Sequence, residues 1–308
     1  LINLIAAHIK RFQFTWQKSG IQLIHTGLIL LLVGELLTGL WQEEYQMRLD
    51  EGQTKNYSES YRENELVIIN TSDSDFDDVV AVPENILAGR QEVQHPKLPF
   101  RVIVRDYYPN AALQMRNQVQ EAPVSPATVG IGPRVVTTPL ALTYKPDERN
   151  LAAAFVELIG PEGSIGTWLV STQLLMPQTF EYASQTFAVS LRFERNYKPY
   201  SLKLLDFTHD VYAGTEIPKN FSSRIKLTTP DGLDDREVLI YMNNPMRYAG
   251  LTFYQAGFDN DDRTTVLQVV HNPSWMLPYI SCVLMMLGLL IQFSFSLVRF
   301  SHQRLATA

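Results

Sequence analysis

Cysteine is almost absent from this chain of 308 residues, which contains a single one, Cys282. A lone cysteine excludes an intramolecular disulfide, a CxxC thiol-redox pair and the CxxCH motif of a c-type cytochrome. The motifs GxxxxGK, GxSxG and HExxH are also absent, and no GxGxxG follows an expected strand. The sequence therefore carries no signature of the phosphate-binding, nucleophilic or zinc chemistry that those motifs support.

Basic residues are scarce over most of the chain. All but five of the 26 lysines and arginines, and all but one of the 32 acidic residues, fall within residues 42–274. This long middle segment is therefore strongly acidic. An acidic segment without a basic patch argues against a nucleic-acid partner.

Two long hydrophobic runs lie near the two ends of the chain. Residues 276–295 are almost wholly apolar, and no charged residue occurs from 272 to 298. The other run, residues 21–41, is as long but contains a few polar side chains. Because about 20 apolar residues cross the hydrocarbon core as a helix, we predict transmembrane helices at 21–41 and 275–298. For the first run, a buried amphipathic helix of a soluble protein is the alternative.

The few basic residues outside the acidic segment flank the two hydrophobic runs. They are Lys10, Arg11 and Lys18 before the first run, and Arg299 and Arg304 after the second. Short basic flanks mark the cytoplasmic side of a membrane protein. We therefore predict cytoplasmic termini, with a short tail at 299–308, and we place residues 42–274 on the opposite side of the lipid bilayer.

Residues 1–20 form a segment of their own ahead of the first run. Their hydrophobic residues recur at steps of three and four, which is the spacing of one helical stripe: Ile2, Ile5, Ile9, Phe12 and Trp16. With the basic residues alongside, this pattern predicts a helix lying on the cytoplasmic membrane surface. The tail of an earlier spanning helix, or a core helix, is the alternative.

The acidic middle of the chain has the patterns of β-structure. Phe187, Val189 and Leu191 alternate with more polar residues, which is the period of a half-buried strand. The turn signal at 230–232 separates two further runs at 224–227 and 238–241, which predicts a hairpin. Further strands are expected at 66–70, 100–107, 202–207 and 264–270. We therefore predict a membrane-anchored, mainly-β fold in which two transmembrane helices flank a β sandwich or open barrel.

His25 is the most informative residue, because it lies inside the first hydrophobic run. An ionisable group there is costly, and imidazole is a common ligand of metals and haem iron. Gly20, Gly27 and Gly34 form a small-residue face suited to close helix packing, and His25 lies about 160–180° from that face. His25 is therefore either a cofactor ligand or a polar group bonded to a neighbouring helix. No other histidine lies in a predicted span, so we expect a second ligand to come from another helix and another chain.

The remaining ionisable candidates are weaker. Glu35 lies about 15 Å along the helix axis from His25, so it cannot share a site with that residue. It is expected to reach the outer interface or to hydrogen-bond a partner helix. His95 and His209 are expected in loops or at a strand end. His271, just outside the second span, is a candidate ligand at the membrane surface. No two of these histidines have the spacing of a metal motif.

Two segments resemble a known family. Residues 243–258, NNPMRYAGLTFYQAGF, followed by a strand and a final span, resemble the ResB (CcsB) family of cytochrome c biogenesis proteins. Residues 25–34, HTGLILLLVG, are similar to the span that precedes the exterior domain in that family. The family usually has two further spans upstream of this helix, so the resemblance leaves open a truncated or a divergent member.

The resemblance implies a function. It implies a subunit that works with a ResC (CcsA)-type membrane partner to carry haem across the bacterial inner membrane, or its thylakoid equivalent. The pair attaches haem to the CxxCH motif of apocytochrome c, so this chain is expected to be a non-catalytic or co-catalytic subunit of the haem lyase. The large domain is expected on the periplasmic or lumenal side.

The resemblance also assigns a role to one residue of this chain. The matching histidine is an axial ligand of the haem iron in the membrane, and that role passes to His25 alone. The cofactor is expected to be haem b, held transiently and shared with the partner. The alternatives are a structural or assembly subunit that binds no haem and, less expected, a ligand-binding receptor domain.

Overall fold

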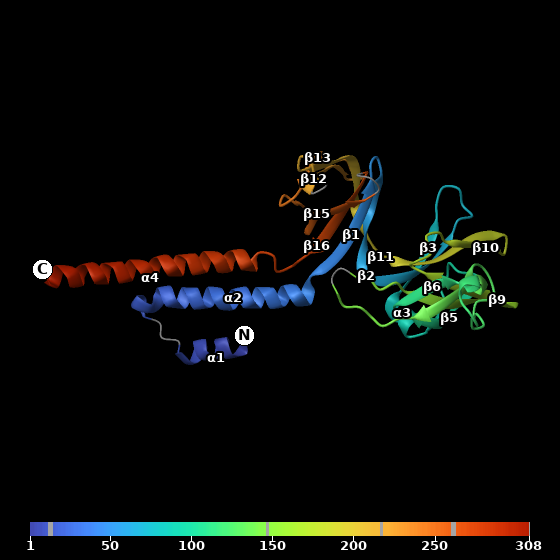
Figure 1. The fold of residues 1–308 in the computed structure, drawn as a ribbon, viewed down its shortest axis with the longest axis horizontal. Coiled ribbons are helices and arrows are strands. Elements are labelled where there is room, and N and C mark those ends of the chain that lie inside the picture. The colour runs from blue at the N-terminus through green and yellow to red at the C-terminus, as the bar shows by residue number, and fades with distance from the viewer. Residues whose placement is uncertain (12–14, 146–147, 216–217, 260–262, 308) are drawn as a thin grey trace.

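Two long helices and a large β domain make up the protein (Figure 1). The computed structural model describes residues 1–11, 15–145, 148–215, 218–259 and 263–307. Helix α2 (Ser19–Trp41) leads into the β domain, and helix α4 (Leu277–Thr307) leaves it. Both are long and apolar enough to cross a membrane. The predicted fold class, two such helices flanking a mainly-β domain, is confirmed.

Helices α2 and α4 pack along the predicted small-residue face. Gly20, Gly27 and Gly34 are the buried residues of α2. A Cβ atom on Gly20 would lie 2.7 Å from the carbonyl oxygen of Gly288, and one on Gly27 would lie 2.7 Å from Cγ of Met285. The glycines are therefore required for the two backbones to approach this closely.

Polar contacts fix the two helices where they meet the β domain. The Thr38 and Ser274 hydroxyl oxygens lie 2.9 Å apart, and Nδ2 of Asn272 donates to the Thr38 hydroxyl at 3.2 Å. The Ser274 backbone N–H in turn donates to Oδ1 of Asn272 at 2.9 Å. The end of α2 is thus joined to the turn that begins α4.

The part of the β domain nearest the helices is a nearly closed barrel. Its antiparallel strands follow the order β13-β12-β11-β2-β1-β16-β15-β14, and contacts between β13 and β15 bring the two ends together. The interior holds a hydrophobic core that includes Met47, Leu202 and Phe253. The strands are β1 (Glu43–Asp50), β2 (Thr54–Asn70), β11 (Gln185–Val211), β12 (Pro218–Thr228), β13 (Asp235–Tyr241), β14 (Met246–Tyr248), β15 (Leu251–Asp259) and β16 (Thr264–His271).

Strands β2 and β11 continue beyond the barrel into a second lobe (Figure 1). There they pair with β3 and β10 and pack against a separate four-stranded sheet of order β4-β5-β8-β9, around a core that includes Leu66, Phe100 and Phe187. A two-stranded sheet, β6–β7, lies beside it. The elements of this lobe are β3 (Asp78–Pro83), α3 (Glu84–Ala88), β4 (Glu92–Val93), β5 (Arg101–Tyr108), β6 (Ala111–Met115), η2 (Arg116–Gln118), η3 (Gly132–Arg134), β7 (Val135–Pro139), β8 (Ala153–Gly160), β9 (Gly163–Ser171) and β10 (Gln178–Tyr182).

The predicted strands are present, with one difference in their organisation. The hairpin is confirmed, because β12 pairs with β13 in a continuous register around the turn at Gly232, which has a φ of +69°. The runs at 187–193 and 202–207, expected as two strands, are two parts of β11. Register shifts at Phe193/Arg195 and Tyr197/Leu202 break the alternation between them.

Helix α1 (Ile2–Arg11) folds back beside the first half of α2 and runs antiparallel to it (Figure 1). Its face toward α2 is not the predicted stripe, since the Ile2 and Ile9 side chains are 81% and 70% exposed. The half-buried residues are Leu4, Ile5 and His8. Phe12 of the predicted stripe lies outside the described residues. The position of this helix at the membrane surface stays a prediction.

Candidate functional site

His25 lies in the second turn of α2, on the side of the helix that faces away from α4. Its side chain is exposed, whereas the glycines on the opposite side are buried against α4. The predicted separation of a packing face and a histidine face is therefore found in the structure. Helix α4 packs on the glycine face and leaves the His25 side chain exposed.

The structure brings His8 to His25. The centroids of the two imidazole rings lie 5.7 Å apart, with the ring planes inclined by 48°. His8 comes from α1 and reaches His25 because α1 doubles back along α2. The short helix η1 (Trp16–Lys18) precedes α2, and the Ser19 hydroxyl donates to the Trp16 carbonyl at 2.8 Å where α2 begins.

Sequence reasoning did not find His8. It expected the second imidazole from another chain, because residues 1–20 lie outside the predicted spans. The sequence offered one signal: His8 follows Leu4 by four residues, so the two share a helical face. A helix that buried this face against residues 21–41, instead of the Ile2 and Ile9 stripe, would carry His8 to the histidine face.

The separation of the two imidazoles can be compared with that of two ligands on one metal. With a metal–nitrogen bond of about 2.0–2.1 Å, two imidazoles on opposite sides of one metal have centroids about 6.3 Å apart. The observed 5.7 Å is close to this value. Imidazole also suits iron as a ligand. Among the described residues, no group of three or more histidine, cysteine, aspartate or glutamate side chains could hold a metal ion.

Glu35 belongs to a different environment, as expected. It is exposed near the end of α2 and lines a hollow of about 900 Å³ between that helix and the rim of the barrel, together with Arg62 and Glu63 of β2. The lining is mainly polar and includes several carboxylates. Glu35 therefore faces the polar end of α2 and not the histidine face.

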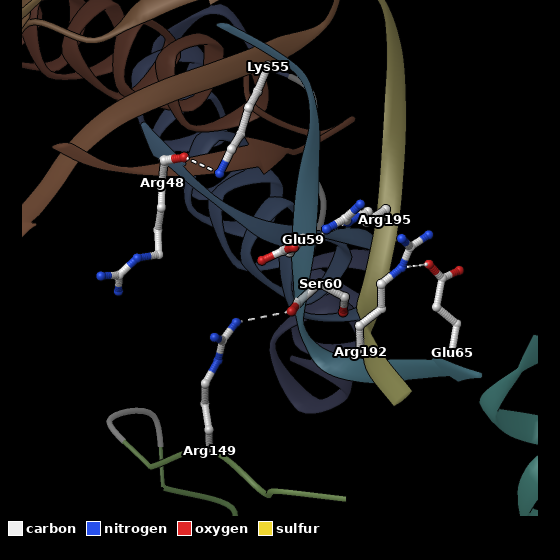
Figure 2. Close-up of polar contacts among 8 residues, drawn as sticks. All are labelled: Arg48, Lys55, Glu59, Ser60, Glu65, Arg149, Arg192 and Arg195. Atoms are coloured by element: carbon white, nitrogen blue, oxygen red, sulfur yellow. Dashed lines mark hydrogen bonds and ion pairs between the residues drawn. The ribbon is translucent and has the colours of Figure 1, made fainter. Parts of the chain in front are cut away.

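A network of charged residues holds β2 against β11 where β2 bends next to this hollow (Figure 2). Nε of Arg192 lies 2.7 Å from Oε1 of Glu65, and Nε of Arg195 lies 3.3 Å from Oε1 of Glu59. Between these two pairs, the register of β2 and β11 shifts by several residues. The ion pairs thus fasten both sides of an irregularity in the sheet.

Arg149 supports the same bend from a separate loop (Figure 2). Its Nη2 donates to the Ser60 carbonyl at 3.0 Å. Its guanidinium lies 4.4 Å from the Tyr61 ring centroid and 4.1 Å from the Phe193 ring centroid. These distances are within the range of cation–π attraction. We read this cluster as structural, since it fixes the strand that forms one wall of the hollow.

The other candidate histidines lie far from His25 along the fold. The Nδ1 atom of His95 accepts the Lys97 backbone N–H at 3.2 Å in an exposed turn. His209 lies in β11 of the barrel, and its ring centroid lies 4.3 Å from that of Phe258. His271 ends β16, and its Nδ1 lies 3.8 Å from a carboxylate oxygen of Glu43. Within the part of the chain that the structure describes, no ring contact joins any of these three to a second histidine.

Residues 243–258 form the β14–β15 hairpin and its approach. The turn uses Ala249 and Gly250, both with positive φ, and the hairpin buries Met246 and Phe253 in the barrel core. The Arg247 guanidinium lies 4.5 Å from the Trp275 ring centroid, just ahead of α4. This segment therefore packs the barrel and braces the start of the second long helix.

Comparison with known proteins identifies the same part of the chain. Residues 164–266, which run from β9 into β16, match the model of the ResB-like family. This part of the chain is therefore similar to the ResB-like family. The match includes residues 243–258, so the resemblance seen in the sequence is confirmed. His8 and His25 lie outside the matched residues.

The chain is also similar to a curated relative. Over 92 residues it is 34% identical to Protein NrfI of Wolinella succinogenes, which covers 30% of this chain. The match spans about a tenth of the length of that relative. The similarity therefore concerns a small part of the relative and leaves the activity of the whole relative outside the comparison.

Proposed function

We propose that this chain is the ResB-like subunit of a cytochrome c synthase, with His25 as the residue that holds haem iron inside the membrane. The proposal combines the ResB-like match with the exposed intramembrane histidine. Cytochrome c biogenesis requires that haem b reach the outer face, where apocytochrome c presents its CxxCH motif. Two candidate spans and a large β domain suit a subunit of such a membrane assembly.

His25 would act as an axial ligand through one nitrogen of its neutral imidazole. Its position on the face of α2 away from α4 keeps the imidazole outside the packing of the two long helices. Helix α4 would fix α2 in place through the glycine face, so that the imidazole is held on a rigid element. Bound haem supplies the vinyl groups to which the cysteine thiols of the apocytochrome add.

The β domain would lie on the periplasmic or lumenal side. The basic flanks Lys10, Lys18, Arg299 and Arg304 favour a cytoplasmic location for both termini. The domain itself contains no cysteine, so it would not compete for the thiols of the apocytochrome. Its polar hollow beside the end of α2 would be the surface that meets a ResC (CcsA)-type partner.

The observation that carries the proposal is an exposed histidine on a candidate membrane span of a ResB-like chain. The test is an absorption spectrum of the chain purified with its co-expressed membrane partner. We expect a reduced low-spin haem signal that is lost in His25→Ala. The matched control is His302→Ala, which removes an exposed histidine of α4 and should leave the signal unchanged.

The main alternative is a structural or assembly subunit that binds no haem. An intact complex without haem, or a haem signal unchanged in His25→Ala, would favour this alternative and contradict the ligand role.

A further inference from the structure

A groove runs along one flank of the helix pair, near the start of α2 and the end of α4. It has a volume of about 680 Å³, within the range of about 300–1,000 Å³ that is typical of small-molecule sites. Leu23 of this flank lies about 160° around α2 from His25. The surface is therefore separate from the histidine face. We call it the helix groove, and its lining includes Trp16, Ser19, Gln22, Leu23, Ile291 and Phe295.

We propose that the helix groove binds one anionic phospholipid from the cytoplasmic leaflet of the membrane. The proposal goes beyond the proposed function, because it gives the chain a lipid ligand that takes no part in holding haem. It rests on the two candidate spans and on the predicted cytoplasmic location of both termini.

The first support is the chemistry of the lining. Trp16 lies at the start of the first candidate span, and tryptophan is typical of the interface between membrane and water. The half-buried amide of Gln22 can donate hydrogen bonds to ester or phosphate oxygens. Leu23, Leu290 and Ile291 supply apolar walls. The groove thus offers an interfacial ring, a hydrogen-bonding amide and an apolar surface, which suit the three regions of a phospholipid.

The second support is that two hydroxyls of the lining are satisfied within the chain. The Ser294 hydroxyl donates to the Leu290 carbonyl at 2.7 Å, and the Ser19 hydroxyl donates to the Trp16 carbonyl at 2.8 Å. Because these hydroxyls already have acceptors, they need no polar group from a ligand. An acyl chain can therefore lie against this part of the groove without leaving these donors unpaired.

The third support is basic charge at the mouth of the helix groove. Lys18 directly precedes Ser19, and Arg299 follows Phe295 by four residues, which is about one helical turn. Both basic side chains are exposed. Helix α4 continues past the start of α2 (Figure 1), so Arg299 lies beyond the apolar walls. The two cations therefore flank the end of the groove from which a headgroup would emerge.

This positive charge is not balanced by acidic residues of the same two segments. Residues 1–34 and 272–308 contain no aspartate or glutamate. Basic pockets between membrane helices on the cytoplasmic side bind anionic lipid headgroups. Charge complementarity therefore favours an anionic phospholipid over a neutral one.

A transmembrane helix of a partner protein is the competing occupant. Close packing of membrane helices depends on small residues, as on the glycine face of α2. In the part of the chain that the structure describes, no glycine lines the helix groove, and much of its wall is made of bulky side chains. An apolar helix would also gain nothing from Lys18 and Arg299. The lining and the charge together favour the lipid.

The test uses the full chain, delipidated in detergent micelles and incubated with equal amounts of phosphatidylglycerol and phosphatidylcholine. Native mass spectrometry counts the lipids that stay bound. For the unaltered chain we expect one retained phosphatidylglycerol. In the double variant Lys18→Gln and Arg299→Gln we expect the preference for phosphatidylglycerol to fall about 25-fold, roughly fivefold for each basic residue near an anionic headgroup.

The matched control is the double variant Lys10→Gln and Arg304→Gln. It removes the same amount of charge from the same predicted side of the membrane, at residues that do not line the groove. We expect this variant to keep the preference for phosphatidylglycerol. The comparison separates a defined site from general attraction between basic flanks and anionic lipid.

A third variant tests where the lipid lies. Ile291→Trp places a large ring in the helix groove, and we expect the retained phosphatidylglycerol to be lost. Leu289→Trp is the control, because Leu289 is 46% exposed and lies about 160° around α4 from Ile291. Thermal unfolding in the same detergent checks that both variants are folded. If Ile291→Trp does not fold, the two double variants still decide the proposal.

Each contrary result identifies a different error. Equal preferences in the two double variants would show that the lipid responds to general charge, and the proposal would be wrong. Phosphatidylglycerol retained in a folded Ile291→Trp variant would place the lipid outside the groove. If that variant keeps the lipid but no longer copurifies with its membrane partner, the groove holds a partner helix instead. None of these results changes the haem spectrum expected for His25→Ala, so the two proposals fail separately.

Discussion

The two faces of α2 serve opposite purposes. One face carries three glycines, is buried against α4 and leaves no space for a single added carbon. The other carries His25, is exposed and meets only the short helix α1. A histidine on a candidate membrane span is costly to retain. The contrast indicates that the glycine face builds the structure, and it supports our proposal that the histidine face carries the chemistry.

The largest loss of stability is expected from a large side chain on the glycine face of α2. In Gly20→Leu the new Cβ would meet the backbone of Gly288 and Gln292 at 2.7–2.8 Å, so the helices must move apart. We expect a loss of about 3 kcal/mol of stability, the upper part of the range for overpacking. Thermal unfolding in detergent measures the change.

The matched control lies on the same helix. A Cβ atom on Gly39 would have no neighbour within 4 Å, so Gly39→Leu should change stability little. The glycine-face account fails if Gly20→Leu unfolds at the same temperature as Gly39→Leu.

A smaller effect is expected at the outer end of the same face. Thr38→Val removes the hydroxyl that contacts Ser274 and accepts from Asn272. We expect a loss of about 1 kcal/mol, typical of one hydrogen-bonding group. Thr26→Val, on the exposed part of the helix, is the control. Equal effects of the two substitutions would show that the polar contact adds nothing.

The β domain, unlike the helix pair, contains two glutamates that meet, Glu63 and Glu194, so its stability is expected to depend on pH. A hydrogen bond to Glu63, followed by burial and by the nearby carboxylates Glu65 and Glu84, raises the pKa of Glu194 to about 7. The folded state therefore favours the protonated form. The resulting stabilisation is complete below the ordinary value of 4.5 and is lost as the pH rises through about 7.

Glu194→Gln should remove this pH dependence. Because solvent screens a partly exposed pair, we expect the variant to be more stable than the unaltered chain at pH 8 by no more than about 1 kcal/mol. Chemical denaturation at pH 5 and pH 8 measures the difference. Glu181→Gln, at an exposed position of β10, should retain the full pH dependence. If Glu194→Gln leaves the change in stability between pH 5 and pH 8 unaltered, that change arises from other groups.

The sequence predicts the parts of the fold that rest on local pattern. The hydropathy of residues 21–41 locates α2 to within two residues, and the seven-residue glycine spacing identifies its packing face. The turn at 230–232 identifies a hairpin. These features depend on residues that are close in sequence, where helical and strand periods apply directly.

The remaining features depend on contacts that no local pattern encodes. Strand β11 is 27 residues long and serves two lobes, but its bulges interrupt the alternation, so the sequence reads as two strands. The pairing of β2 with β11 joins residues more than a hundred positions apart. The position of His8 beside His25 was not predicted, because the most hydrophobic stripe of α1 points away from α2. In a membrane, lipid can cover such a stripe, so the strongest apolar pattern need not mark the packing face.

The most direct test of the division between the two faces measures haem content and stability together in His25→Ala. The chain is purified with its partner for haem content and without haem for thermal unfolding, because a bound ligand would itself stabilise the protein. We predict that haem falls to background while the stability of the haem-free protein changes by no more than about 0.5 kcal/mol, as for other surface substitutions. Haem retained in the variant, or haem lost together with stability as in Gly20→Leu, would contradict the assignment of chemistry to the histidine face.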